Sequence, residues 1–275
     1  MIHLFPKLKK KTLLICAGYI ALAGVYVALN RSSNLLFPII ILLVGLIAIV
    51  IGQLLTAFNM HNQLLSRLYS QLDVSGFLRE YEPFLNLQLK HSLHLMVRLH
   101  LSNAYCALGR FDEAQALLTS ISVPKGKKPE DELLSRFAIV SNLCYFAEQK
   151  EDIGSAQKYL DELLSLKTQL EALQTRKPEK KRMVFNTELN EQCMKYLNTG
   201  NADIEVLKTL IQNNSQQLHK ITLSLWLARC YLAVNSRREA ETLLERIVNL
   251  APDLYPGKMA AQILSSLPGN SKADA

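Results

Sequence analysis

Residues 35–58 read LLFPIIILLVGLIAIVIGQLLTAF, and residues 12–29 read TLLICAGYIALAGVYVAL. Neither stretch holds a charged residue over its 24 or 18 positions. At about 1.5 Å per helical residue the two stretches span roughly 36 and 27 Å, against a hydrocarbon core of about 30 Å. Only the polar turn 30–34 separates the two stretches. Because lipid offers the backbone no hydrogen-bond partner, each stretch must form a helix to cross the bilayer. We therefore predict a transmembrane helical hairpin over 12–58.

A cleaved signal peptide is the alternative for the first stretch, because its start is rich in lysine. However, no small-x-small cleavage site precedes the polar turn cleanly, and a longer apolar run follows at once. A lipoprotein anchor at Cys16 is disfavoured, since Ile15 stands where a small residue would be needed. Both stretches are therefore expected to remain as membrane helices.

Basic residues set the expected orientation of this hairpin. Four lysines lie between residues 7 and 11, whereas the turn holds only Arg31. Basic flanks stay on the cytoplasmic side, so we expect the N-terminus (1–11) and, after two crossings, residues 59–275 to be cytoplasmic. The cell membrane of a bacterium is favoured over an organelle because no organelle address is visible. Five widely spaced cysteines in apolar helical contexts suit a reducing compartment.

The net charge of +7 on 275 residues is concentrated at the N-terminus. Residues 1–34 carry +5 and no acid, while residues 59–275 hold 26 basic and 24 acidic side chains. A nearly balanced domain gives nucleic-acid binding little support, so no nucleic-acid partner is expected.

Small residues recur along one face of each apolar stretch. Such residues let two backbones approach closely in lipid, where dispersion drives association. We expect the hairpin to pack on itself through them, because the short turn already holds the helices together; a homo-oligomer face is the alternative. The two sets are Ala17, Ala21, Gly24 and Ala28, and Gly45, Ala48, Gly52 and Thr56.

From Asn59 onward the apolar periodicity is helical. Residues 101–121, LSNAYCALGRFDEAQALLTSI, show an apolar face, a break at Gly109-Arg110 and a second apolar face with acids at its start, where they suit the helix dipole. Residues 225–252, LWLARCYLAVNSRREAETLLERIVNLAP, share the same offsets, with nine residues from tyrosine to alanine in both units. Each stretch predicts a helix–turn–helix unit.

These units resemble tetratricopeptide repeats, whose pattern is a Leu-small pair, a Tyr three residues later, a Gly, an aromatic residue, an Ala nine after the Tyr, and a later Pro. The matching residues are Leu101, Tyr105, Gly109, Phe111 and Ala114, and then Leu227, Ala228, Tyr231, Ala240 and Pro252. The resemblance covers roughly residues 85–265 and implies an all-α fold, a solenoid of stacked helix pairs. A generic α-helical bundle is the alternative.

The middle units match less well. Ala156 fits the pattern in residues 137–163, but Glu205 stands where alanine is expected in residues 189–211. We expect a helical connector or degenerate repeat over 59–88, the repeat domain over 89–267 with a capping helix at 255–267, and a disordered tail over 268–275.

No pattern of catalytic or metal-binding residues emerges. His91, His94 and His100 lie on one predicted helix, but only His91 and His94 share a face. No carboxylate or thiolate at helical spacing supplies the third ligand that a metal site would need. The chain has no HExxH, no GxSxG, no phosphate-binding glycine loop and no paired-cysteine motif. We therefore expect no enzyme activity and no metal or other cofactor.

Two basic segments, PKGKKPED (124–131) and TRKPEKKR (175–182), are open to two interpretations. They could touch anionic lipid, because the domain is tethered to a cytoplasmic leaflet. Their interleaved acids favour solvated loops instead.

The resemblance also implies a binding groove, lined in this family by the first helix of each unit. By position after the Leu-small pair, the groove residues are Asn103, Arg229 and Asn142. Asn103 could hydrogen-bond a peptide backbone and Arg229 could pair with a carboxylate; the alternative is that they only solvate the surface. The family's carboxylate clamp is not expected, because Leu99 and Leu225 stand where its lysines would be.

Together these features predict a membrane-anchored adaptor or scaffold that binds a protein or peptide partner through a cytoplasmic repeat groove. The alternative is a small accessory subunit of a membrane complex, with the functional contacts made by the hairpin.

Overall fold

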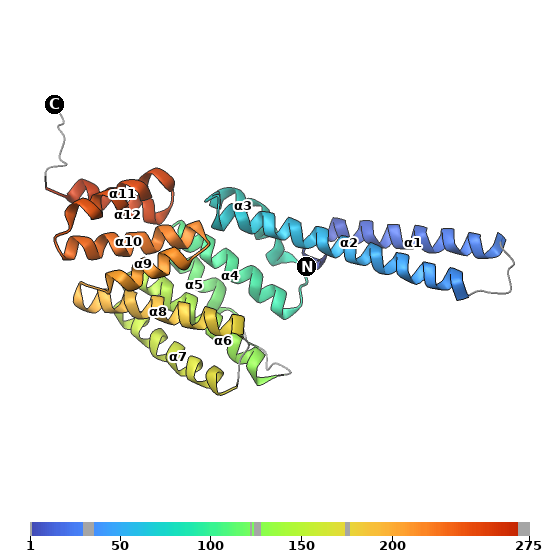
Figure 1. The fold of residues 1–275 in the computed structure, drawn as a ribbon, viewed down its shortest axis with the longest axis horizontal. Coiled ribbons are helices and arrows are strands. Elements are labelled where there is room, and N and C mark those ends of the chain that lie inside the picture. Colours follow the sequence, from blue (N-terminus) through green and yellow to red (C-terminus); the bar gives the residue numbers. More distant parts are fainter. Residues whose placement is uncertain (1, 30–35, 122, 124–127, 174–176, 269–275) are drawn as a thin grey trace, which may run out of the picture.

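The computed structural model describes residues 2–29, 36–121, 123, 128–173 and 177–268. Over these ranges the regular structure is helical throughout, without a strand. Two long helices project to one side of a helical domain (Figure 1). The all-helical prediction is thereby confirmed. The turn 30–34 and the tail 269–275 lie outside the described residues.

The projecting pair is α1 (Pro6–Leu29) and α2 (Leu36–Tyr69), with a short helix η1 (Ile2–Leu4) before it. The two helices lie side by side and antiparallel (Figure 1). Within α2, Ile39–Tyr69 is long and apolar enough to cross a membrane by length and composition, and its apolar window is not buried in the fold. It is the one such helix among the described residues.

Both ends of this pair are built into the core of the domain. The final turns of α2 bury Leu64, Leu68 and Tyr69, and Leu4 of η1 is fully buried in the same cluster. Phe5 meets Phe84 edge-on, with ring centroids 5.6 Å apart. Apolar burial of this kind is worth about 25 cal/mol per Å². The helical pair is therefore attached to the domain without a flexible linker.

The rest of the domain is a succession of paired helices. Residues 70–90 form α3 (Val74–Tyr81) and η2 (Glu82–Asn86), with Asp73 accepting a hydrogen bond from the amide of Gly76 at the start of α3. The pairs that follow are α4 (His91–Ala107) with α5 (Phe111–Thr119), α6 (Pro129–Gln149) with α7 (Ile153–Ala172), α8 (Lys177–Thr199) with α9 (Ile204–Asn213), and α10 (Gln217–Ala233) with α11 (Arg237–Leu250). The last helix, α12 (Tyr255–Ser266), packs on α11.

Each helix pair turns on a residue with positive φ. These residues are Gly109, Glu151, Gly200 and Asn235, with φ of 80°, 58°, 72° and 59°. A left-handed residue after a helix ends the helix and reverses the chain. Ala114, Ala156 and Ala240 are fully buried within the second helices of their pairs, where a small side chain allows close packing.

The last helices of the chain also contact the first ones. α12 contacts α4 as well as α10 and α11, and α10 contacts α2. The array therefore closes on itself, so that α4, α6, α10 and α12 surround a common interior.

The small-residue stripes do not pack as expected. A Cβ added at Gly18, Gly24 or Gly52 would meet nothing within 4 Å, whereas one at Gly45 would run into the ring of Tyr19. The Tyr19 hydroxyl donates a hydrogen bond to the carbonyl of Ile41 at 3.1 Å. Of the eight residues in the two sets, Gly45 is the one that is not exposed, so the two helices do not pack through these sets.

This contact generates a prediction. Gly45→Ile should destabilise the helical pair by about 1–3 kcal/mol, because its side chain must displace Tyr19. The measurement is thermal unfolding by circular dichroism in detergent. Gly52→Ile, in open space, is the control; equal melting temperatures for the two variants would contradict the packing described.

Candidate binding surface

The predicted groove residue Asn103 lies half-buried on α4, facing the interior. Its side-chain amide donates to the hydroxyl of Tyr69, 3.1 Å away, and that hydroxyl lies 2.9 Å from Nδ1 of His100. Asn103 therefore links α4 to the last turn of α2.

Arg229 and Asn142 are also held by their own chain. The guanidinium of Arg229 lies 3.0 Å from Oε1 of Glu151 and 5.0 Å from the ring centroid of Trp226, and its side chain is only 12% exposed. The Asn142 amide donates to the carbonyl of Ala138 at 2.7 Å, one turn earlier in α6. The structure does not bring the three residues into one site, because only Asn103 borders the interior cavity.

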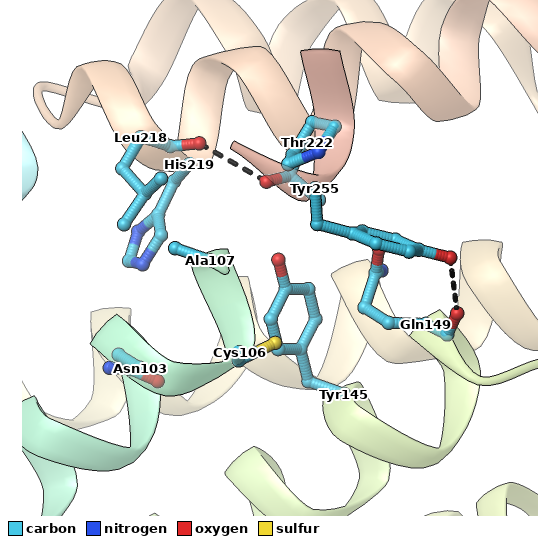
Figure 2. Close-up of a pocket in the computed structure, with 10 residues that line it drawn as sticks. Asn103, Cys106, Ala107, Tyr145, Gln149, Leu218, His219, Thr222 and Tyr255 are labelled. Atoms are coloured by element: carbon cyan, nitrogen blue, oxygen red, sulfur yellow. Dashed lines mark hydrogen bonds between the residues drawn. The ribbon is translucent and has the colours of Figure 1, made fainter. Parts of the chain in front are cut away.

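That cavity lies between α4, α6, α10 and α12 (Figure 2). It has a volume of about 20 Å³, which is room for about one water molecule. Its walls include Tyr145 and Gln149 from α6 and His219 and Thr222 from α10. In this conformation the inner face of the helix array is filled by the protein's own side chains.

Tyr255 at the start of α12 completes this closure. Its hydroxyl donates to the carbonyl of Gln149 at 3.0 Å, which Figure 2 shows as a dashed line. Its ring meets Phe111 edge-on with centroids 4.9 Å apart. It also packs on Gly109, where an added Cβ would approach the ring to 3.1 Å. α12 thus joins the first helix pair to the second.

A buried carboxyl lies in the same domain. Glu148 of α6 is fully buried, its Oε1 lies 3.3 Å from the Sγ of Cys144, and the Cys193 thiol also hydrogen-bonds to it. Burial raises the pKa of Glu148 to about 8, so this carboxyl is protonated at neutral pH. Burial likewise raises the pKa of the Cys144 and Cys193 thiols, which are therefore weak nucleophiles.

Two histidines in the interior, His100 and His219, contribute the opposite pH dependence. Burial lowers the pKa of His100 to about 3 and that of His219 to about 4. Both lie beside Tyr69, with ring centroids 5.7 and 5.6 Å from its ring. Their neutral forms belong to the fold, so the stability they contribute is complete above about pH 6.5 and is lost as the pH falls toward 4.

Sequence reasoning missed most of this interior. Tyr145, Glu148, Gln149 and Tyr255 have no motif around them, although a glutamate at the end of the apolar segment 137–147 was a visible signal. Among the described residues, no group of three or more His, Cys, Asp or Glu side chains is placed to hold a metal ion. His91, His94 and His100 do not form such a group.

No protein-family model matches the chain, and the searches of curated proteins and of solved structures found no match either.

The buried carboxyl generates a second prediction. Because the pKa of Glu148 is raised above its unfolded value, its contribution to stability is complete below about pH 4.5 and is lost as the pH rises through 8. Glu148→Gln removes this dependence, so the variant should gain stability over the parent between about pH 5 and pH 8, by on the order of 1 kcal/mol or more. Urea unfolding at several pH values measures the difference. The exposed Glu171→Gln is the control, and a parallel pH profile for parent and Glu148→Gln would contradict the assignment.

A third prediction concerns the ion pair that joins α10 to the end of α6. Arg229→Glu and Glu151→Arg should each lower the free energy of unfolding by about 1 kcal/mol, and the double exchange should recover part of the loss. Denaturant midpoints of the four proteins give the coupling energy. The same exchange at the exposed Arg110–Glu113 pair is the comparison, and additive effects at Arg229 and Glu151 would show that the pair contributes nothing.

Proposed function

We propose that this protein is a membrane-anchored adaptor: a two-pass hairpin in the cell membrane holds a cytoplasmic, tetratricopeptide-like helical domain that binds a protein or peptide partner. It has no enzymatic role in this proposal. The observation that carries the proposal is the long apolar surface exposed on both α1 and α2. These two helices are joined directly to the core of the helical domain.

The exposed apolar surface supports insertion of both helices. Leu14 and Leu22 on α1 are 74% and 71% exposed, and Val44 and Ile47 on α2 are 60% and 58% exposed. Soluble monomers do not present continuous apolar surfaces of this size, whereas lipid solvates them.

The junction supports two crossings rather than one. The start of α1 is held by Leu4 and the end of α2 by Leu68, in the same buried cluster. If α2 crosses the bilayer away from the domain, α1 must cross it too. The exposed lysines at the start of α1 favour the cytoplasmic side for that end, and therefore for both termini.

The interior cavity does not favour catalysis. A cavity with room for about one water molecule is too small to enclose a substrate, for which sites of at least about 300 Å³ are usual. The paired helices with buried alanines at their crossings fit stacked repeats.

Binding at Asn103 and Arg229 requires opening contacts that the chain makes with itself. A peptide carboxylate would compete with Glu151 for Arg229, and a peptide backbone would compete with Tyr69 for Asn103. Opening these contacts weakens the intrinsic affinity. Attachment to the membrane offsets the loss, because it raises the local concentration of a partner at the same surface.

The outward small residues favour a second candidate, an accessory subunit whose hairpin contacts other membrane helices. Gly24 and Gly52 leave open space where a neighbouring helix could approach closely.

One experiment tests the adaptor, and it is the fourth prediction. A partner captured from detergent extract by the full chain should be lost on combining Asn103→Ala with Arg229→Glu, and retained when an unrelated two-pass anchor replaces the hairpin. Unchanged capture by the double variant would reject the groove, and loss of the partner on hairpin exchange would favour the accessory subunit.

A separate experiment tests the topology. A tag after Ala275 that is reachable from outside intact cells would reject the cytoplasmic location of the C-terminus.

A further inference from the structure

The end of the helical domain that faces the hairpin carries a basic ridge, formed by Lys180, Lys181 and Arg182 near the start of α8. All three side chains are exposed, and no ion pair joins them to another described residue. In Figure 1 the starting ends of α4, α6 and α8 all lie on the side of the domain toward the projecting pair. The start of α8, which carries these three residues, therefore lies toward the membrane in the proposed topology.

Apolar side chains accompany the ridge. Val184 is 51% exposed one turn further along α8, and Leu173 at the end of α7 is 44% exposed. Between them Met183 is only 2% exposed and packs into the α6–α7 core, so the ridge is held in a fixed position. Basic side chains beside exposed apolar ones are the composition that suits the headgroup region of a bilayer.

The position of these charges is not explained by helix stability. Cations near the start of a helix oppose its macrodipole, which favours acids there. At the start of α6 the usual arrangement holds, with Glu130, Asp131 and Glu132 in the first turn. The first turn of α8 has only Glu179. Lys180, Lys181 and Arg182 follow it directly, in a part of the helix where the macrodipole disfavours cations.

A second set of unpaired cations lies at the base of the hairpin. These exposed residues are Lys7, Lys9, Lys10 and Lys11. Neither α1 nor α2 contains an acidic residue, and the first acid in the chain is Asp73. Since η1 and the end of α2 are fixed in the core, these lysines and the ridge keep one orientation relative to each other.

We propose that the basic ridge of α8 binds the anionic phospholipid headgroups of the leaflet in which the hairpin starts, so that the domain rests against the bilayer. The inference rests on the proposed membrane anchor. Each basic side chain near an anionic surface strengthens association by roughly fivefold. The segments 124–127 and 174–176 lie outside the described residues and are not needed for this contact.

The experiment, a fifth prediction, uses the full chain in lipid nanodiscs, with Cys16→Ala and a spin label at Val184→Cys. In discs that contain phosphatidylglycerol the label should lose water accessibility relative to phosphatidylcholine discs, and added salt should reverse the loss. A label at Val234→Cys is the matched control, because Val234 is 43% exposed and follows α10 at its far end. It should not respond to lipid charge.

Charge reversal gives the second arm. Lys180→Glu, Lys181→Glu and Arg182→Glu together should abolish the response at 184, whereas Lys158→Glu, Lys195→Glu and Arg238→Glu together should leave it unchanged. An unresponsive label, an equal response in neutral discs, or a response to soluble polyglutamate instead of anionic lipid would each overturn the inference. The lipid comparison uses one unaltered ridge, so it does not depend on how the reversal variants fold.

Retention in the discs separates the two proposals. If the chain does not co-elute with the nanodiscs or is extracted by alkali, the membrane anchor itself is rejected. If the chain is retained but the label at 184 is silent, only the headgroup contact is rejected.

Discussion

The burial of Leu4 and Leu68 in one apolar cluster is the contact on which the arrangement of this protein depends. It ties the beginning of α1 and the end of α2 to the same core, so the projecting pair and the domain form one body. Without it, α1 would be held only by its packing along α2. With this contact, the position of the start of α1 determines the position of the end of α2.

The sequence was sufficient for the helical content and for the apolar surface. The charge-free run at 35–58 and the apolar periodicity at 101–121 each depend on local composition, which a single chain displays directly. The turns were predictable at Gly109 for the same reason. The turn between α6 and α7 was not predictable in this way, because Glu151 adopts positive φ there and no glycine marks the position.

The interior could not be predicted from the sequence because it depends on contacts between distant segments. Tyr255 and Gln149 are 106 residues apart, and their hydrogen bond exists only because α12 returns to the earlier helices. The positions of Asn103 and Arg229 on their helices were readable, but their partners Tyr69 and Glu151 come from other elements. The exposure of the small residues likewise depends on which faces of α1 and α2 meet, and this is a contact between separate segments.

The uninterrupted course of α2 has a mechanical consequence. Its 34 residues run as a single rod of about 51 Å from the apolar run into the centre of the domain. Any tilt of this rod must swing the remote helices α11 and α12 through the same angle, because the end of α2 is fixed in the core of the domain. Inserting one residue into the rod would turn everything beyond it by about 100°, against the restraint of the buried N-terminus.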